Sequence, residues 1–137
     1  MPPLKRRIET AESLEHGKGI GPAVAALTPP GEQSAVREQM EAINKWFLDR
    51  NDPLALAAVA RGNGALWASE ERLRANRLPA LAVVGELDPL RASVDRLASI
   101  MGNLKVVVVP GANHMFAVRR PEFLEALKTF LAAHPDK

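Results

Sequence analysis

The sequence contains no cysteine and no tyrosine, and aromatic residues make up only 4% of its 137 residues. The absence of cysteine excludes a disulfide-stabilised scaffold and a thiolate nucleophile. Because aromatic side chains are so few, the core must be built from Leu, Val, Ile, Ala and Met. With 47% hydrophobic and 25% charged residues, the composition is that of a folded globular chain of about one domain.

Long apolar runs are also missing. No stretch approaches the roughly 18 to 20 apolar residues that a membrane-spanning helix needs. The opening residues, MPPLKRR, are basic but are not followed by the apolar segment of a secretory signal. We therefore expect a cytoplasmic protein with no membrane partner.

Neither charge sign is in clear excess. The 18 Lys and Arg residues nearly balance the 16 Asp and Glu residues, which leaves a net charge of +2. The basic residues are scattered from Lys5 to Lys137 and form no stripe with interleaved aromatics. This distribution is typical of a solvated surface, so nucleic acid is not expected among the partners.

The chain divides at Pro79 into a predicted helical segment, residues 1–77, and a second part, residues 78–137. Helices are expected over residues 34–50, 53–60 and 69–76. Ser34 is the expected N-cap of the first of them, whose apolar stripe comprises Val36, Met40, Ile43 and Phe47. Glycine and proline punctuate the first thirty residues so densely that only a short helix near residues 24–27 is expected there.

The second part follows the order strand, helix, strand, helix. The apolar runs 80–85 and 106–109 do not alternate with polar residues, which indicates parallel strands covered on both faces. A helix is expected over 91–101, and a final helix begins at Pro121. The side chains expected to face inward from this last helix are Phe123, Leu124, Leu127, Phe130 and Leu131. The predicted class is α/β. No third strand is found upstream, so we expect this part to be either the C-terminal portion of a larger α/β domain or a unit that another chain covers.

The turns after the two strands carry the candidate chemistry. Asp88 stands in Gly85-Glu86-Leu87-Asp88, and His114 stands at the same spacing in Gly111-Ala112-Asn113-His114. Because parallel strands bring their carboxyl ends to one edge of a sheet, we expect Asp88 and His114 within reach of one another. An Asp that accepts the Nδ1 proton of a His fixes its tautomer for acyl transfer. The competing interpretation is that both are ordinary turn residues at the surface.

Several segments of the second part together resemble the end of the α/β-hydrolase fold. They are residues 78–89 (LPALAVVGELDP), 106–115 (VVVVPGANHM), 120–123 (RPEF) and 130–131 (FL). The resemblance implies the last two strands and last helices of that fold, with residues 1–77 loosely similar to a helical cap. It also implies that Asp88 is the triad acid and His114 the triad base of a hydrolase acting on ester, lactone or related acyl bonds, or on carbon–carbon bonds as some capped members do.

The sequence departs from that family at the nucleophile. None of its five serines (Ser13, Ser34, Ser69, Ser93 and Ser99) stands in a G-x-S-x-G elbow, and the oxyanion loop is missing with it. We therefore expect a shortened homologue, inactive as an isolated chain unless a preceding segment or a partner chain supplies a nucleophile. Without one, His114 could still activate water weakly. The alternative is a non-catalytic truncated homologue that self-associates, as a homodimer or larger oligomer, through its uncovered sheet.

Other polar and aromatic groups carry weaker hypotheses. The segment His16-Gly17-Lys18-Gly19 could replace an oxyanion loop, but no strand precedes it. Arg119 and Arg120 could bind an anionic substrate, although exposed surface residues are the favoured interpretation. The aromatic residues Trp46, Phe47 and Trp67 could line an acyl pocket, with a core or partner-facing role favoured. No cofactor is expected, and the three histidines lack the spacing of metal ligands.

Overall fold

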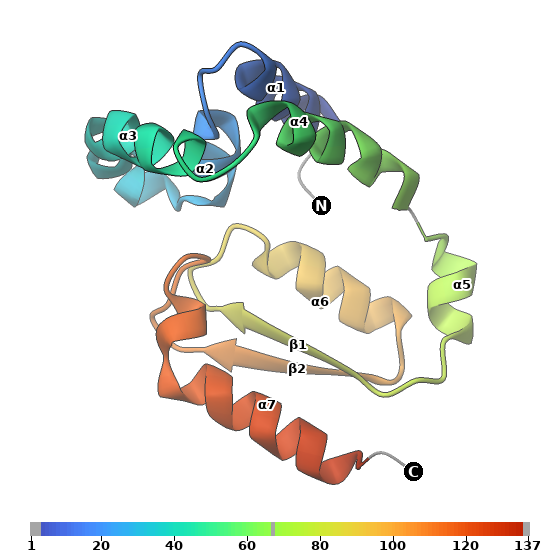
Figure 1. Cartoon of the computed structure of the whole chain (residues 1–137). Coiled ribbons are helices and arrows are strands. Elements are labelled where there is room, and N and C mark those ends of the chain that lie inside the picture. The colour runs from blue at the N-terminus through green and yellow to red at the C-terminus, as the bar shows by residue number, and fades with distance from the viewer. Residues whose placement is uncertain (1–3, 67, 136–137) are drawn as a thin grey trace. The chain divides into compact units, whose positions relative to one another are not determined.

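The computed structural model describes residues 4–66 and 68–135. The chain forms two compact units, Met1–Trp67 and Ala68–Lys137 (Figure 1). The boundary expected from sequence, between residues 77 and 78, lies further along the chain. The intervening helix α5 (Glu70–Ala75) belongs to the second unit, where it contacts helix α6 (Arg91–Ile100).

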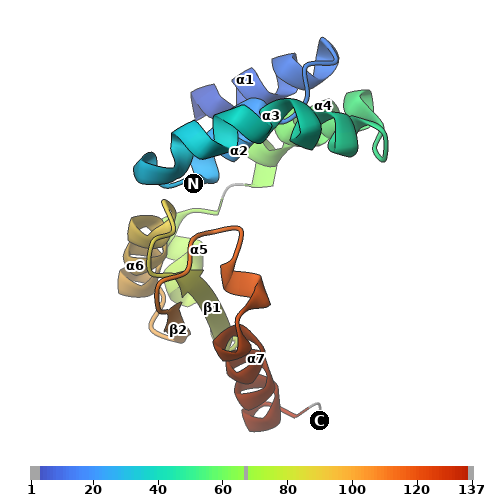
Figure 2. The same cartoon turned by 90° about the vertical axis from the view of Figure 1, so that its left-hand side faces the viewer.

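Every secondary-structure element among the described residues of the first unit is a helix (Figure 2). Its elements are α1 (Leu4–Glu15), α2 (Gly21–Leu27), the 3₁₀ helix η1 (Pro30–Glu32), α3 (Gln33–Leu48), α4 (Pro53–Gly62) and the 3₁₀ helix η2 (Asn63–Leu66). The predicted helices over 34–50 and 53–60 are confirmed as α3 and α4. Asp52 caps α4, because its side chain accepts hydrogen bonds from the backbone N–H groups of Leu54 and Ala55.

Two alanines and a leucine form the buried contact between α1 and α4. Ala11, Leu14 and Ala57 are buried at this contact, with exposed fractions of 0%, 2% and 1%. At its edge, Arg61 donates hydrogen bonds through Nε and Nη2 to the two carboxylate oxygens of Glu15, each over 2.8 Å. These bonds hold the pKa of Glu15 below its ordinary value.

Two expectations about the first unit are wrong. Helix α1 was not predicted, although no glycine or proline interrupts its residues; the breakers that argued against it begin only at Gly17. Ala11 and Leu14 form the buried face of this helix, at helical spacing. Ser34 is not an N-cap, because the 3₁₀ turn beginning at Pro30 runs directly into α3 and leaves Ser34 inside the helix.

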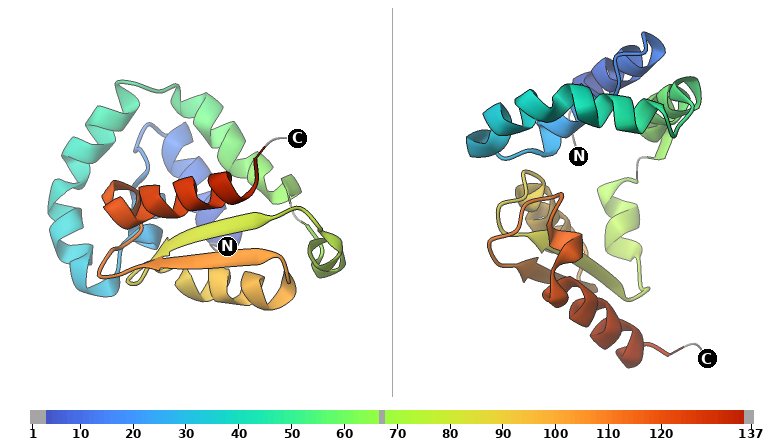
Figure 3. Two further views of the ribbon diagram at one scale, coloured as in Figure 1. Left: turned by 90° about the horizontal axis from the view of Figure 1, so that it is seen from below. Right: turned by 60° about the vertical axis from the view of Figure 1, so that its left-hand side comes forward.

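The second unit is built around two parallel strands. Its further elements are β1 (Ala80–Gly85), β2 (Leu104–Val109), the 3₁₀ helix η3 (Ala117–Arg119) and α7 (Pro121–Ala133). The strands pair from Ala80 opposite Leu104 to Gly85 opposite Val109. Helix α6 lies on one face of the sheet and α7 on the other (Figures 1 and 3). The prediction of parallel strands with helical cover on both faces is confirmed.

The core of this unit is concentrated at the carboxyl ends of the strands. Val84 and Val109 are buried, and so are Ala112 and Ala117 in the segment after β2. The predicted inward orientation of the α7 leucines is wrong: the exposed fractions of Leu124, Leu127 and Leu131 are 52%, 36% and 64%. A two-stranded sheet is too narrow to cover more of the helix than the face that carries Phe123 and Phe130.

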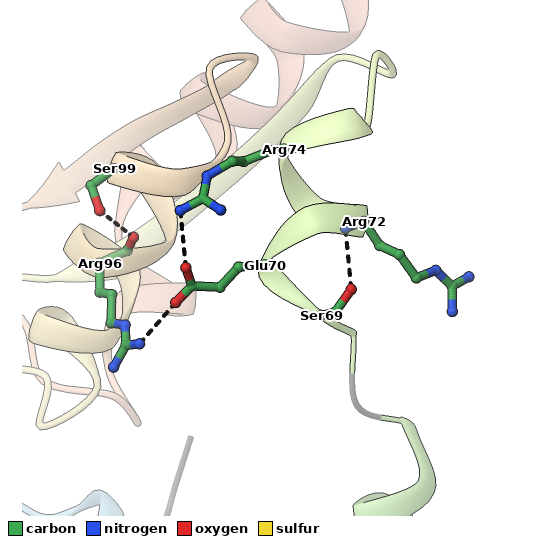
Figure 4. A network of polar contacts seen from close by, with 6 residues as sticks. All are labelled: Ser69, Glu70, Arg72, Arg74, Arg96 and Ser99. Atoms are coloured by element: carbon green, nitrogen blue, oxygen red, sulfur yellow. Dashed lines mark hydrogen bonds and ion pairs between the residues drawn. The ribbon is translucent and has the colours of Figure 1, made fainter.

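A polar network joins α5 to α6 (Figure 4). Glu70 accepts hydrogen bonds from Nη2 of Arg96 and Nη2 of Arg74, each over 3.0 Å. The bond from Arg96 and the nearby charge of Arg74 lower the pKa of Glu70. Ser69 caps α5, because its hydroxyl accepts a hydrogen bond from the backbone N–H of Arg72.

The described residues are thus mostly helical, with one small parallel sheet, which is compatible with an α/β class. No helix among residues 4–66 and 68–135 is long and apolar enough to cross a membrane.

Candidate active site

Asp88 is held rigidly in the turn between β1 and α6. Its backbone N–H donates a hydrogen bond to the carbonyl of Gly85 over 3.2 Å, and its Oδ1 accepts one from the N–H of Leu90 over 2.8 Å. The Asp88 side chain is only 6% exposed. One carboxylate oxygen is therefore engaged with the backbone, and Oδ2 is left to face the neighbouring loop.

His114 lies in the loop between β2 and α7. The preceding residue, Asn113, shapes this loop, because its Oδ1 accepts hydrogen bonds from the backbone N–H groups of Met115 and Phe116. Its carbonyl oxygen accepts another from the N–H of Ala117, at the start of η3. The loop is thus folded back on itself around Asn113, and this fold fixes where His114 leaves the backbone.

The structure brings Asp88 and His114 together. Nδ1 of His114 lies 2.8 Å from Oδ2 of Asp88. The expected proximity is confirmed, and the strand register accounts for it, because Gly85 and Val109 are paired at the ends of their strands. The His114 side chain is 36% exposed, so an almost buried carboxylate meets a partly accessible imidazole.

This arrangement has a defined chemical capacity. An ionised carboxylate can only accept hydrogen bonds, so the proton of a neutral His114 ring lies on Nδ1. The other ring nitrogen, Nε2, then carries a lone pair that can take a proton from a hydroxyl group or a water molecule. A buried acceptor also stabilises the imidazolium that such a transfer creates.

Two residues that the sequence analysis did not single out, Gly85 and Glu86, join the loops. The carbonyl of Ala112 passes so close to Gly85 that a β-carbon there would lie 2.2 Å from the oxygen. Glu86 accepts a hydrogen bond through Oε2 from the backbone N–H of Gly111 over 2.8 Å. Backbone bonds from Glu86 to Val109 and from Leu87 to Ala112 complete the junction. The glycine between a buried strand and Asp88 was the available signal for this close approach.

The serines hold other positions, all within the described part of the chain. Ser13 donates a hydrogen bond to the carbonyl of Gly19, Ser69 caps α5, and Ser99 donates one to the carbonyl of Arg96. Ser34 lies in α3 and Ser93 in α6. No serine therefore occupies the turn after a strand, where an α/β-hydrolase presents its nucleophile.

The weaker candidates have structural explanations. The glycines of Gly17-Lys18-Gly19 end α1, where both adopt positive φ angles of 67° and 84°. His16 lies against the carbonyl of Glu12 through Nδ1. These residues follow a helix and are in the first unit, so they do not have the place of an oxyanion loop after a strand.

Arginine and aromatic candidates pair with near neighbours. Arg119 lies over the ring of Phe116 at 5.7 Å, and Arg120 approaches Glu122 at 3.9 Å. Trp46 is 58% exposed, with the guanidinium of Arg50 over its ring, and is not a core residue. Phe47 packs partly buried against the core of the first unit, and Trp67 lies outside the described residues.

Exposed apolar side chains come from the same two loops as the pair. They are Leu87, Met115, Phe116 and Val118, whose exposed fractions range from 50% to 60%. Leu87 immediately precedes Asp88, and Met115 and Phe116 immediately follow His114. The loops that carry the pair therefore offer apolar surface directly beside Asp88 and His114, with the exposed charges of Glu86 and Arg119 further along the same loops.

Among the residues that the structure covers, no group of three His, Asp or Glu side chains could hold a metal ion. No protein-family model matches the chain, and the search of curated proteins finds no match. The relationship to the α/β-hydrolases therefore stays a prediction from the segments that carry the resemblance.

Proposed function

We propose that Asp88 and His114 form the acid and base of an acyl-transfer site, in a protein of the α/β-hydrolase superfamily that acts on ester, lactone or related acyl bonds. The observation that carries this proposal is the 2.8 Å contact between His114 Nδ1 and Asp88 Oδ2 at the carboxyl ends of two parallel strands. The partial exposure of the imidazole supports it, because a buried ring could not reach a substrate.

The proposed reaction needs one nucleophile and one acyl substrate. His114 Nε2 takes the proton from a hydroxyl group as its oxygen bonds to the carbonyl carbon of the substrate. Asp88 stabilises the imidazolium until the bond to the leaving group breaks. The proton on Nε2 then passes to the leaving alkoxide, which departs as an alcohol and restores the neutral histidine.

The nucleophile is the part that the five serines do not provide. In our proposal it is water, or a hydroxyl group supplied by another polypeptide segment or chain. Water alone supports only weak hydrolysis, because the chain has no elbow serine and no oxyanion loop of the family's type. The exposed apolar side chains beside the pair favour an uncharged acyl group as the substrate.

The test is hydrolysis of a p-nitrophenyl ester of a short-chain acid, in the absence and presence of methanol as a soluble hydroxyl nucleophile. We expect methanol to accelerate ester cleavage, with the methyl ester as product. His114→Ala should lower the cleavage rate, on the order of a hundredfold if the full general-base contribution is realised.

The two other histidines provide the matched controls. His16 and His134 each place Nδ1 against a backbone carbonyl rather than a carboxylate. Since any accessible imidazole cleaves activated esters slowly, His16→Ala and His134→Ala measure that background. If all three variants lose the same small fraction of activity, or if His114→Ala loses none, His114 has no special role and the proposal is wrong.

A second candidate function, self-association, is favoured by the sheet itself. Each strand pairs with one neighbour, so within the described residues its outer edge has no strand partner. A second copy presents the same unpaired edge, and a twofold axis would let the two equivalent edges form backbone hydrogen bonds with each other. The exposed leucines of α7 add apolar surface to this unit. A light-scattering mass of a dimer or larger oligomer would support this candidate, and the mass of a monomer would exclude it.

A further inference from the structure

Glu86 connects the two loops of the candidate site through its side chain. It follows β1 directly, and its carboxylate reaches the segment after β2, where Oε2 accepts the backbone N–H of Gly111 over 2.8 Å. The side chain is exposed, so burial does not explain its position. A charged acceptor makes this hydrogen bond stronger than one between neutral groups.

The backbone around Gly111 is arranged to make this contact. Gly111 has a φ angle of +61°, a conformation that L side chains rarely adopt. Its predecessor, Pro110, has no N–H group, so the N–H of Gly111 is the first backbone donor after β2. Glu86 therefore holds the loop at its beginning, before the chain turns through Asn113 to His114.

We infer that Glu86 is a positioning residue, which keeps the loop of residues 110–116 in the register that places His114 Nδ1 against Asp88 Oδ2. The inference rests on the proposed function for its catalytic meaning. Glu86 does not touch the imidazole; it acts through Gly111 and the backbone that follows. The bond from the Leu87 N–H to the Ala112 carbonyl holds the same loop but uses no side chain.

The experiment compares Glu86→Ala with Glu86→Gln by nuclear magnetic resonance of ¹⁵N-labelled full-length chain. Glu86→Ala removes the acceptor, whereas the amide oxygen of Glu86→Gln can still accept the Gly111 N–H. Glu125→Ala is the matched control, since it removes an exposed carboxylate on α7 that pairs with Lys128. Circular dichroism confirms that each variant is folded.

Two signals are read. The ring nitrogen shifts of His114 report how much of the neutral ring carries its proton on Nδ1, and amide exchange of Leu87 reports opening of the loop junction. In Glu86→Ala we expect the Nδ1–H form to decrease and the exchange of the Leu87 amide to rise about tenfold. Glu86→Gln should restore most of both signals, and Glu125→Ala should leave them unchanged.

The inference is overturned if both signals of Glu86→Ala match the wild type, or if only overall stability falls while the tautomer of His114 stays the same. Its failure is distinguishable from failure of the proposed function, because neither signal requires turnover. The tautomer of His114 could change in Glu86→Ala although the protein shows no His114-dependent ester cleavage. That result would support the positioning role of Glu86 and contradict the catalytic role of His114.

Discussion

Gly85 and Ala112 approach so closely that the site has no room for a side chain at position 85. A β-carbon on Gly85 would lie 2.2 Å from the carbonyl oxygen of Ala112 and 3.0 Å from that of Asn113. Both neighbours are backbone atoms, which cannot move aside like the end of a flexible side chain. The loop that carries His114 therefore crosses the end of β1 at a distance that only glycine permits.

Gly85→Ala should accordingly destabilise the protein by about 2 kcal/mol or more, because the Ala112–Asn113 backbone must shift. Urea unfolding measures this change. Gly102→Ala is the control, since a β-carbon on Gly102 would have no atom within 4 Å. Equal stability of the two variants would mean that the close approach at Gly85 is not maintained in solution.

Asp88→Asn tests the orientation of the imidazole. The amide oxygen can still accept the Leu90 N–H, but the amide nitrogen would present a donor to His114 and favour the wrong tautomer. We expect ester cleavage to fall at least about tenfold, as judged by kcat/KM. Asp95→Asn, which changes an exposed carboxylate paired with Arg91, should have no such effect. An undiminished rate in Asp88→Asn would remove Asp88 from the mechanism.

The contact of Glu70 with Arg96 and Arg74 predicts a pH-dependent contribution to stability. These arginines lower the pKa of Glu70 in the folded protein. The contribution is therefore fully present above the ordinary pKa of a glutamate, and it is lost as the pH falls through the lower folded value. The difference in unfolding free energy between wild type and Glu70→Gln should be present near neutrality and disappear in acid.

The difference in unfolding free energy between wild type and Glu70→Gln should also shrink at high salt, because Glu70, Arg74 and Arg96 are solvent-exposed. Glu71→Gln is the control: it changes the neighbouring carboxylate, which has no ion pair among the described residues. A stability difference for Glu70→Gln that is constant across the pH range would contradict an electrostatic origin.

Ala57→Leu tests the packing of α1 on α4. Ala57 is 1% exposed and lies against Ala11 and Leu14, so the larger side chain must separate the helices. We expect a loss of about 1 to 3 kcal/mol in thermal or urea unfolding. Ala58→Leu, at an exposed position of the same helix, should be nearly neutral. If both substitutions are tolerated equally, α1 does not pack on α4 through this face.

The strand–helix–strand–helix order was predictable because each element carries a strong local signal. Valine-rich runs, a periodic apolar face and Pro121 at a helix start need no knowledge of distant residues. Helix α1 was not predicted because the many glycines and prolines that follow it, from Gly17 onward, were taken to exclude a helix over the whole N-terminal region. Its buried face becomes meaningful only once Ala57, far along the chain, packs against it.

In the candidate site, too, one part was predictable from the sequence and another depends on contacts between distant residues. The meeting of Asp88 and His114 follows from a general rule about parallel strands, so the sequence was sufficient to predict it. The contributions of Gly85 and Glu86 depend on where the second loop passes in space, which no spacing along the chain encodes. The exposure of the α7 leucines likewise depends on the width of the sheet rather than on helical periodicity.

The pairing of Gly85 with Val109 decides where the chain can change in length. His114 meets Asp88 through the ends of the two strands, so the number of residues in α6 and in its connection to β2 does not enter the geometry. An insertion after α6, at residues 101–103, should therefore leave the pair intact. One added residue between Gly85 and Asp88, or between Val109 and His114, would shift one side chain of the pair and break the contact between His114 Nδ1 and Asp88 Oδ2. The chain can therefore change in length at the amino-terminal end of β2, but not at the carboxyl ends of the two strands, where the pair lies.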